Sequence, residues 1–356
     1  MADGVTGGTA PSAGLDAVRP EPAQSSPEGP RLTNVRFTGS GWEYFRIWAI
    51  NMALTLLTLG VFSAWATVRT RRYFYGNTWL GDSAFNYTAR PWTILIGRVI
   101  VVGVLIALWL AELVSIAYYI IATVMLFSLY PWIAVRARAF RLRNSFYRHV
   151  CWGFEGNYGT AAKYYCLGPI VGILSLGIMF PYIAMRRDMF LIRNSRFGTS
   201  ECSFDVTSGQ YYGIYFATFG IFVAALVANT ILVAALPAGF AFALSLVTWM
   251  PILLAGLYMK VRLDNLRWSN TTVGAYWFSL ELSFWQMLGL YLSNLVLIVV
   301  TLGAYIPFAK VRVIRYKLGR FRIVRQGNET FFAGPRQTLG AVGAEAGDSF
   351  GLDLGI

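Results

Sequence analysis

The chain alternates long apolar segments with short basic and aromatic ones. Seven apolar segments hold about 20 residues or more, enough to cross a ~30 Å hydrocarbon layer as helices that rise about 1.5 Å per residue. They lie at residues 44–67, 92–113, 115–135, 162–185, 211–235, 239–259 and 285–309. This pattern predicts an all-α polytopic membrane protein.

Two pairs of these segments read as helical hairpins. The run from Gly213 to Met259 contains no charged residue and is interrupted only by the sequence LPAG, a turn signal, at 236–239. The run from Pro91 to Val135 has a similar length, with Glu112 near its expected turn. Each run predicts two helices that cross the membrane and return.

An internal repeat organises the chain. When the Gly residues at 60, 177 and 303 are aligned, TLGVFSAWATVR, SLGIMFPYIAMR and TLGAYIPFAKVR match without gaps. Two further units share only their basic ends, YPWIAVRARAFRLRNS and AGLYMKVRLDNLRWSNT. In four units an arginine is followed eight residues later by Asn and then by Ser or Thr. These pairs are Arg69 and Asn77, Arg136 and Asn144, Arg186 and Asn194, and Arg262 and Asn270. The fifth unit has Arg312 followed by Arg320 and Phe321.

The end of each unit predicts a helix stop followed by a β-hairpin. Basic residues suit the negative end of a helix, and Asn tolerates the left-handed conformation that ends one. The stretches NTWLGDSAFNY, NSRFGTSECSFDV and RFRIVRQGNETFF then place aromatic or β-branched residues around a Gly-containing turn. We therefore expect short β-hairpins at the cytoplasmic face between the membrane helices.

The two ends of the chain differ from its body. Residues 1–34 and 333–356 are rich in Gly and small residues, which cannot bury a core, so both tails are expected to be disordered. Residues 35–332 form the membrane domain of five units.

Charge sharpens the picture of a membrane protein. Only 13% of residues are charged and 56% are hydrophobic, which argues against an ordinary soluble enzyme. Thirty Lys and Arg face 17 Asp and Glu, giving a net charge of +13. The five basic exits at 68–78, 136–148, 186–196, 260–267 and 310–325 hold 22 of those 30. The positive-inside rule places them in the cytoplasm, with anionic lipid headgroups rather than nucleic acid as the nearest partner.

Seven straight spans cannot put all five exits on one side. The alternative makes 44–67, 162–185 and 287–309 re-entrant, each broken at its Thr-Leu-Gly or Ser-Leu-Gly, so that only the two hairpins cross fully. Both arrangements leave the C-terminus in the cytoplasm and they disagree about the N-terminus. Labelling of Cys202 from outside the cell would distinguish them.

Ten residues are candidates for a functional site. Asn51, Asn294 and Glu112 are polar groups within apolar segments, where they serve a polar path, helix packing or, for Glu112, the headgroup layer. Seven arginines at the exits either bind lipid headgroups or only fix orientation. They are Arg69, Arg72, Arg136, Arg186, Arg262, Arg312 and Arg315.

Catalytic and metal chemistry have little support in the sequence. His149 and Cys151 stand alone, because no second pair follows at zinc-ligand spacing, and no nucleophile or nucleotide-binding motif is present. We expect neither an enzyme nor a bound cofactor or metal.

Two segments carry a family signature. EYFRIWAINMALTLLTLGVFSAWATVRTRRYFYGNTWLG at 43–81 and TLGAYIPFAKVRVIRYKLGRF at 301–321 resemble the YjgN-like family of bacterial inner-membrane proteins, a domain of unknown function. The resemblance extends over residues 35–332. It implies a bacterial inner-membrane location with a cytoplasmic C-terminus, and it brings no substrate, reaction or catalytic residue.

Two functions follow as hypotheses. The first is transport or handling of a small molecule or an anionic lipid, favoured by repeats, broken helices and clustered arginines. The second is a non-catalytic scaffold that binds a partner through its cytoplasmic hairpins. A transporter should bring Asn51, Asn294 or Glu112 into a mid-membrane cavity, whereas a scaffold should have a packed interior and an exposed apolar patch on its hairpins.

Overall fold

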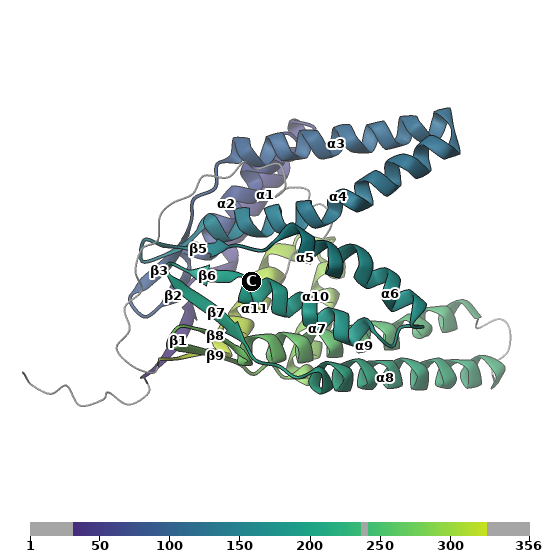
Figure 1. The fold of residues 1–356 in the computed structure, drawn as a ribbon. Coiled ribbons are helices and arrows are strands. Elements are labelled where there is room, and N and C mark those ends of the chain that lie inside the picture. The colour runs from purple at the N-terminus through teal and green to yellow at the C-terminus, as the bar shows by residue number, and fades with distance from the viewer. Residues whose placement is uncertain (1–30, 236–240, 326–356) are drawn as a thin grey trace, which may run out of the picture.

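The computed structural model describes residues 31–235 and 241–325, and its strands form a closed barrel from which helix pairs extend (Figure 1). The strands are β1 (Arg31–Phe37), β2 (Thr78–Leu80), β3 (Ser83–Tyr87), β4 (Ser145–Tyr147), β5 (Val150–Phe154), β6 (Ser195–Phe197), β7 (Ser200–Phe204), β8 (Thr271–Val273), β9 (Tyr276–Leu280) and β10 (Phe321–Arg325). The barrel order is β1-β10-β9-β8-β7-β6-β5-β4-β3-β2, with antiparallel neighbours throughout.

The expectation of an all-α protein is therefore wrong. The hairpins do not stand alone between helices, because each pairs with the next, as β3 does with β4 and β5 with β6. Isolated hairpins would leave rows of unpaired backbone N–H and C=O groups, and closing the sheet on itself removes every edge. Alternating side chains over three to five residues predict a strand. They do not show that the edge of the strand outside its own hairpin is also paired.

The first arm of the fifth expected hairpin is β10, and its second arm lies outside the described residues. β10 pairs with β9 on one side and with β1 on the other. The barrel is closed by the N-terminal strand. Residues 31–34, which we expected in the disordered tail, belong to β1. The tails beyond it, 1–30 and 326–356, lie outside the described residues.

Large apolar side chains fill the barrel. Tyr147, Val150, Phe197, Cys202 and Val273 form one buried cluster drawn from five strands. β1 shows the alternation behind it, since Val35 is buried and its neighbours on either side are exposed. The barrel interior is thus a packed core rather than an open channel.

The helices leave one end of the barrel in pairs (Figure 1). They are α1 (Gly41–Leu57) with α2 (Ser63–Gly76), α3 (Pro91–Val114) with α4 (Ile116–Arg143), α8 (Ser208–Ala235) with α9 (Ala241–Ser269), and α10 (Phe284–Val300) with α11 (Ile306–Gly319). In the remaining pair, α5 (Tyr158–Ala162), a π-helical turn η1 (Lys163–Leu167) and α6 (Gly168–Leu174) form the first leg and α7 (Phe180–Arg193) the second. We call each helix pair and its following strands a unit, numbered 1 to 5. The second helix of each unit packs on the first leg of the next, and α11 packs on α1.

Three of the predicted apolar segments are helical hairpins with a tight turn. Leu59, Leu176 and Leu302 occupy the turns with φ of 50°, 53° and 50°, and the glycine that follows each has a φ of 90° to 92°. The leucines are 92% to 97% exposed, so they lie at the tips. Segments 44–67, 162–185 and 285–309 therefore turn back on themselves, which is the geometry of the re-entrant alternative.

The other two pairs are longer. Within the described residues, three helices are long and apolar enough to cross a membrane, namely α3, α4 and the Ser208–Ile231 part of α8. At most 11% of each apolar window is buried inside the molecule, so most of their apolar surface lies on the outside, as in helices that cross a bilayer. The expected turn at 236–239 falls outside the described residues.

The turn glycines give a prediction with a built-in control. A Cβ at Gly60 meets no atom within 4 Å, so the cost of Gly60→Ala comes from its φ of 92° alone. We expect the free energy of unfolding to fall by about 1–2 kcal/mol. Gly103 lies inside α3 with equally open space, and Gly103→Ala should raise it by about 0.5–1 kcal/mol. Thermal unfolding in detergent measures both, and shifts of the same sign would contradict the assigned turn.

Candidate functional site: a basic belt at the helix bases

The Asn-Ser/Thr motif ends four of the second helices. The Asn Nδ2 atoms donate to the carbonyl four residues earlier, at 2.9 Å for Asn77, 2.8 Å for Asn144 and 2.7 Å for both Asn194 and Asn270. The hydroxyl that follows each does the same at 2.6–2.9 Å. These Asn residues do not adopt the expected left-handed conformation, because φ is −94°, −92° and −89° in the first three. In these three, the carbonyl that accepts from the Asn Nδ2 also accepts from the Asn backbone N–H, so the side chain doubles the last backbone bond of the helix.

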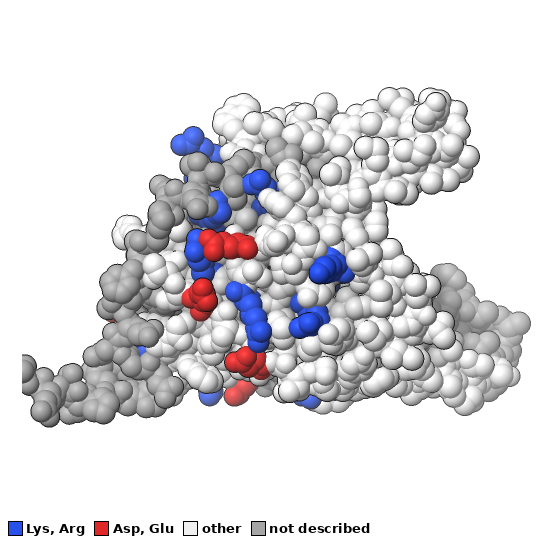
Figure 2. Space-filling model, viewed as in Figure 1, with Lys and Arg blue, Asp and Glu red and all other residues white. Residues whose placement is uncertain are grey.

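Four second helices share this ending, and Arg320 stands at the same place in the fifth. Arg69, Arg136, Arg186, Arg262 and Arg312 each stand eight residues before the residue that caps the helix, about 12 Å along it at 1.5 Å per residue. We call these five residues the basic belt. Figure 2 shows that on one face the charged side chains lie over the barrel and the helix bases, while the outer parts of the helices carry none.

In units 1 and 5 a buried asparagine holds the belt arginine. Arg69 Nη1 donates to Asn51 Oδ1 at 3.3 Å, and Arg312 Nη1 to Asn294 Oδ1 at 2.7 Å. Asn51 and Asn294 are 5% and 3% exposed. Both asparagines thus pack the two legs of their own unit together.

Unit 3 replaces this asparagine with glycine for a steric reason. A Cβ at Gly168 would lie 2.7 Å from Ile183 Cγ2, which leaves no room for a side chain. Arg186 instead lies over the Tyr182 ring, 5.6 Å from its centroid. Arg136 and Arg262 lie similarly over Trp132 and Tyr258, at 5.7 and 6.0 Å.

Arg72 and Arg315 have a different contact, three residues beyond the belt. Arg72 donates to the carbonyls of Tyr87, at the end of β3, and of Ala89, in the linker to α3. Arg315 donates to the carbonyl of Gly39, between β1 and α1. Both arginines are exposed residues.

Glu112 does not join the other candidates. It is exposed and lies near the tip of the α3–α4 hairpin, about 32 Å along α3 from Pro91, whereas Asn51 lies only about 15 Å along α1. The three intramembrane polar candidates therefore do not form a common site.

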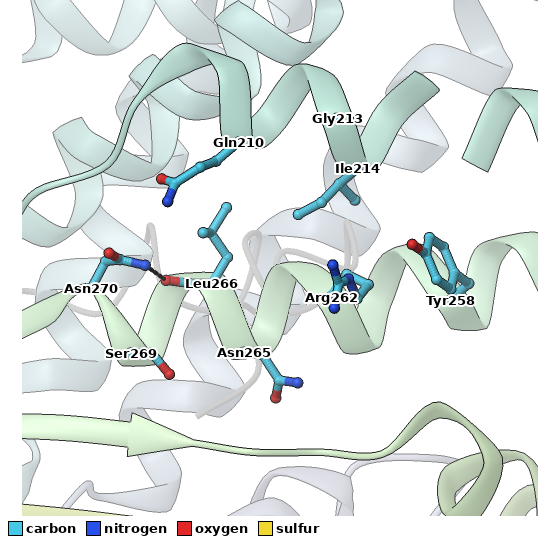
Figure 3. Close-up of a pocket in the computed structure, with 9 residues that line it drawn as sticks. All are labelled: Gln210, Gly213, Ile214, Tyr258, Arg262, Asn265, Leu266, Ser269 and Asn270. Carbon is cyan, nitrogen blue, oxygen red and sulfur yellow. Dashed lines mark hydrogen bonds between the residues drawn. The ribbon is translucent and has the colours of Figure 1, made fainter. Parts of the chain in front are cut away.

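Two grooves open beside the belt at equivalent places. The first has a volume of about 480 Å³ and lies between α8 and α9, with Gln210 and Leu266 pointing into it and Arg262 on its wall (Figure 3). The second, about 590 Å³, lies between α10 and α11. It is lined by Gln286, Gly289, Leu290, Ser293, Arg312, Arg315, Tyr316, Gly319 and Arg320. Equivalent residues line the two grooves. Gln210 corresponds to Gln286, and Arg262 corresponds to Arg312, so the same geometry recurs in units 4 and 5.

The opposite side of the second helices carries charge pairs between units. Asp188 is 2% exposed and accepts from Arg267 Nε and from the Tyr211 hydroxyl, both at 2.7 Å. Asp264 accepts from Lys317 Nζ at 2.9 Å. We did not single out these residues from the sequence. Their signal was a shared distance from the belt, since each aspartate follows its belt arginine by two residues.

Cys202 cannot serve as the reporter of sidedness. It is 6% exposed inside the barrel, and burial raises the pKa of its thiol to about 12. A thiol that is both buried and kept protonated reacts slowly with maleimide from either side of the membrane.

A ring of helix pairs with bilayer-facing apolar surfaces above a basic belt defines an integral membrane protein. The chain belongs to the family described as bacterial protein of unknown function (DUF898), whose model matches residues 32–349. This confirms the YjgN-like resemblance. Inner membrane protein YjgN of Salmonella typhimurium is 29% identical over 150 residues, 42% of this chain and 38% of that protein. Inner membrane protein YjgN of Escherichia coli K12 is 39% identical over 51 residues, 14% of this chain and 13% of that protein. The chain thus matches well under half the length of these relatives. No solved structure matches.

Proposed function

We propose that this inner-membrane protein handles anionic phospholipid, binding the headgroup phosphate at the basic belt. The observation that carries the proposal is the α10–α11 groove, which brings Arg312, Arg315 and Arg320 to one cavity. Each guanidinium has five N–H donors and spends one or two on protein groups, so donors and positive charge remain for a phosphate.

The apolar surface next to the groove suits the acyl chains. Leu295, Val296 and Val299 of α10 are 57% to 65% exposed directly beyond the belt. A phospholipid bound with its phosphate in the groove would therefore lay its chains along exposed apolar side chains. The α8–α9 groove repeats the arrangement with Arg262 and Gln210. This recurrence also supports the proposal that the five units are internal repeats.

The proposal includes a membrane orientation. The barrel and the belt lie in and below the cytoplasmic headgroup layer, because basic residues next to membrane segments are retained on that side. The C-terminus follows β10 and is cytoplasmic in this orientation.

Lipid binding can be tested with matched charge losses. We expect Arg312→Gln combined with Arg320→Gln to weaken phosphatidylglycerol binding about tenfold or more and to remove its preference over phosphatidylcholine, because two charge-assisted phosphate contacts are lost. Native mass spectrometry of protein with defined lipids measures this. Arg36→Gln combined with Arg322→Gln removes the same two charges from exposed barrel positions on β1 and β10 and is the control. Equal lipid binding by wild type and the double variant would rule out the groove as a headgroup site.

One observation favours a second candidate, a scaffold. Leu32, Val324 and Trp277 lie side by side across β1, β10 and β9, and Leu32 and Trp277 are 70% and 53% exposed. This is a small apolar row on the outside of the barrel. Trp277→Ser would abolish a partner's binding at this row and leave lipid binding unchanged, so the same variant separates the two candidates.

A further inference from the structure

The hairpins of units 1, 3 and 5 end in a turn that supplies its own hydrogen bonds. In each turn the hydroxyl before the Leu-Gly pair donates to a carbonyl of the first leg at 2.6–2.9 Å. It also accepts the backbone N–H of the residue that precedes the second helix, at 2.9–3.0 Å. These hydroxyls belong to Thr58, Ser175 and Thr301. Six consecutive backbone N–H groups in each turn thus have acceptors, at residues 58–63, 175–180 and 301–306.

The outside of these turns is apolar. Next to the three leucines at the tips, Leu57, Leu174 and Val300 are 73% to 79% exposed. No charged residue lies at positions 47–68, 164–185 or 282–309. So many exposed apolar side chains are unfavourable in water and are not in hydrocarbon. Irregular backbone is normally kept out of hydrocarbon because its polar groups lack partners, and these turns remove that cost for their N–H groups.

The distance from the belt to the tip separates the short units from the long ones. In units 1, 3 and 5 the belt arginine follows the turn glycine by nine residues, about 14 Å at 1.5 Å per residue. Arg136 follows the first residue of α4 by 20 residues and Arg262 follows that of α9 by 21, about 30 Å in each case. These lengths are half and the whole of a ~30 Å hydrocarbon layer. Figure 1 shows the difference for neighbouring units, because α8 and α9 extend well beyond the turn between α6 and α7.

We propose that the turns of units 1, 3 and 5 lie at the middle of the bilayer, where their leucines contact the acyl-chain ends of the leaflet away from the barrel. Units 2 and 4 cross both leaflets, and Glu112, which is exposed near the tip of α3–α4, then reaches the opposite headgroups. Lipids of the far leaflet therefore lie over the three short hairpins and beside the two long ones. The proposal takes from the lipid-handling function only the level of the belt, in the headgroup layer, and needs no lipid in the grooves.

Spin labels measure the depth of the tips. In a chain without native cysteines, a nitroxide is attached to Leu59→Cys, Leu176→Cys or Leu302→Cys, which removes no packing because these leucines are 92% to 97% exposed. Val114→Cys, at a position 72% exposed at the end of α3, is the matched control. In liposomes, collision of the label with oxygen is compared with its collision with a water-soluble nickel chelate.

We expect the oxygen-to-nickel collision ratio at the three tips to exceed that at Val114 about tenfold or more, because the polar chelate does not enter hydrocarbon. Equal ratios at all four positions would overturn the proposal. The depth of the tips is also measured with Arg312→Gln and Arg320→Gln added. It should be unchanged there even though lipid binding in the groove is lost, so failure of the lipid proposal and failure of this one give different results.

Lysine at the same positions gives a second readout. In lipid nanodiscs, Leu59→Lys should lower the Tm by about 5 °C or more relative to Val114→Lys, because a charge at the bilayer centre costs far more than one in the headgroup layer. Both leucine and valine side chains are largely exposed, so neither variant loses much packing within the protein. Equal Tm values for the two variants would contradict the proposed depth.

Discussion

Replacing Asp188 by Asn is expected to lower the free energy of unfolding by about 3–5 kcal/mol, because it leaves a buried cation without its partner. The Asp188 side chain is 3% exposed and that of Arg267 is 25% exposed. The two side chains come from α7 and α9, so the loss also loosens the contact between units 3 and 4. The Tyr211 hydroxyl loses a charged acceptor at the same time.

A surface ion pair provides the control. Asp205 pairs with Arg193 at 3.3 Å, but these side chains are 85% and 50% exposed. Asp205→Asn should therefore change stability by no more than about 0.5 kcal/mol. Adding Arg267→Gln to Asp188→Asn should restore part of the loss, since it removes the orphaned charge. Thermal unfolding in detergent measures all three variants, and equal shifts for Asp188→Asn and Asp205→Asn would contradict the buried network.

A charge placed at Val35 is expected to open the barrel. Val35 is 6% exposed on β1 and pairs with Leu80 of β2, so Val35→Asp buries a carboxylate at the seam where the N-terminal strand closes the sheet. We expect a loss of about 3 kcal/mol or more. Because β1 is the partner of both β10 and β2, two strands lose their neighbour when it detaches.

The same strand contains a matched position. Leu32 is 70% exposed on the opposite face of β1, and Leu32→Asp should change stability by no more than about 0.5 kcal/mol. Proteolysis in detergent, with Tm measured in parallel, distinguishes the variants. We expect Val35→Asp to become sensitive to cleavage while Leu32→Asp resists as the wild type does. Equal resistance of both variants would mean that β1 does not close the barrel.

Local signals in the sequence place most helices and helix ends. The largely apolar run at 91–135, whose charged residues are Arg98 and Glu112, contains α3 and most of α4. The Asn-Ser/Thr motif marks the ends of four second helices, because capping depends on residues four apart. The Leu-Gly positions also mark the three tight turns. The two apolar helices on either side of each turn together have the length of one straight membrane span. The sequence alone therefore does not decide between a straight span and a hairpin that turns back.

The closure of the barrel and the charge pairs between units depend on contacts between residues far apart in the sequence. β1 meets β10 across nearly the whole described chain, and a strand of seven residues has no local feature that names its partner. Arg267 and Asp188 are 79 residues apart. The Asn51–Arg69 and Asn294–Arg312 bonds could have been predicted, because both join residues 18 apart in two segments whose sequences align.

One barrel carries all five helix pairs, so its hairpin turns must lie on one side of the membrane. Single cysteines at Asp82, His149, Thr199 and Ala275, in a chain without native cysteines, place a reporter in each of the four hairpin turns. An impermeant maleimide applied to intact cells and to inverted membrane vesicles reads their side. We expect all four to react only in inverted vesicles. Labelling of the Thr199 and Ala275 positions from outside intact cells, with the other two protected, would contradict the barrel and return the chain to seven straight spans.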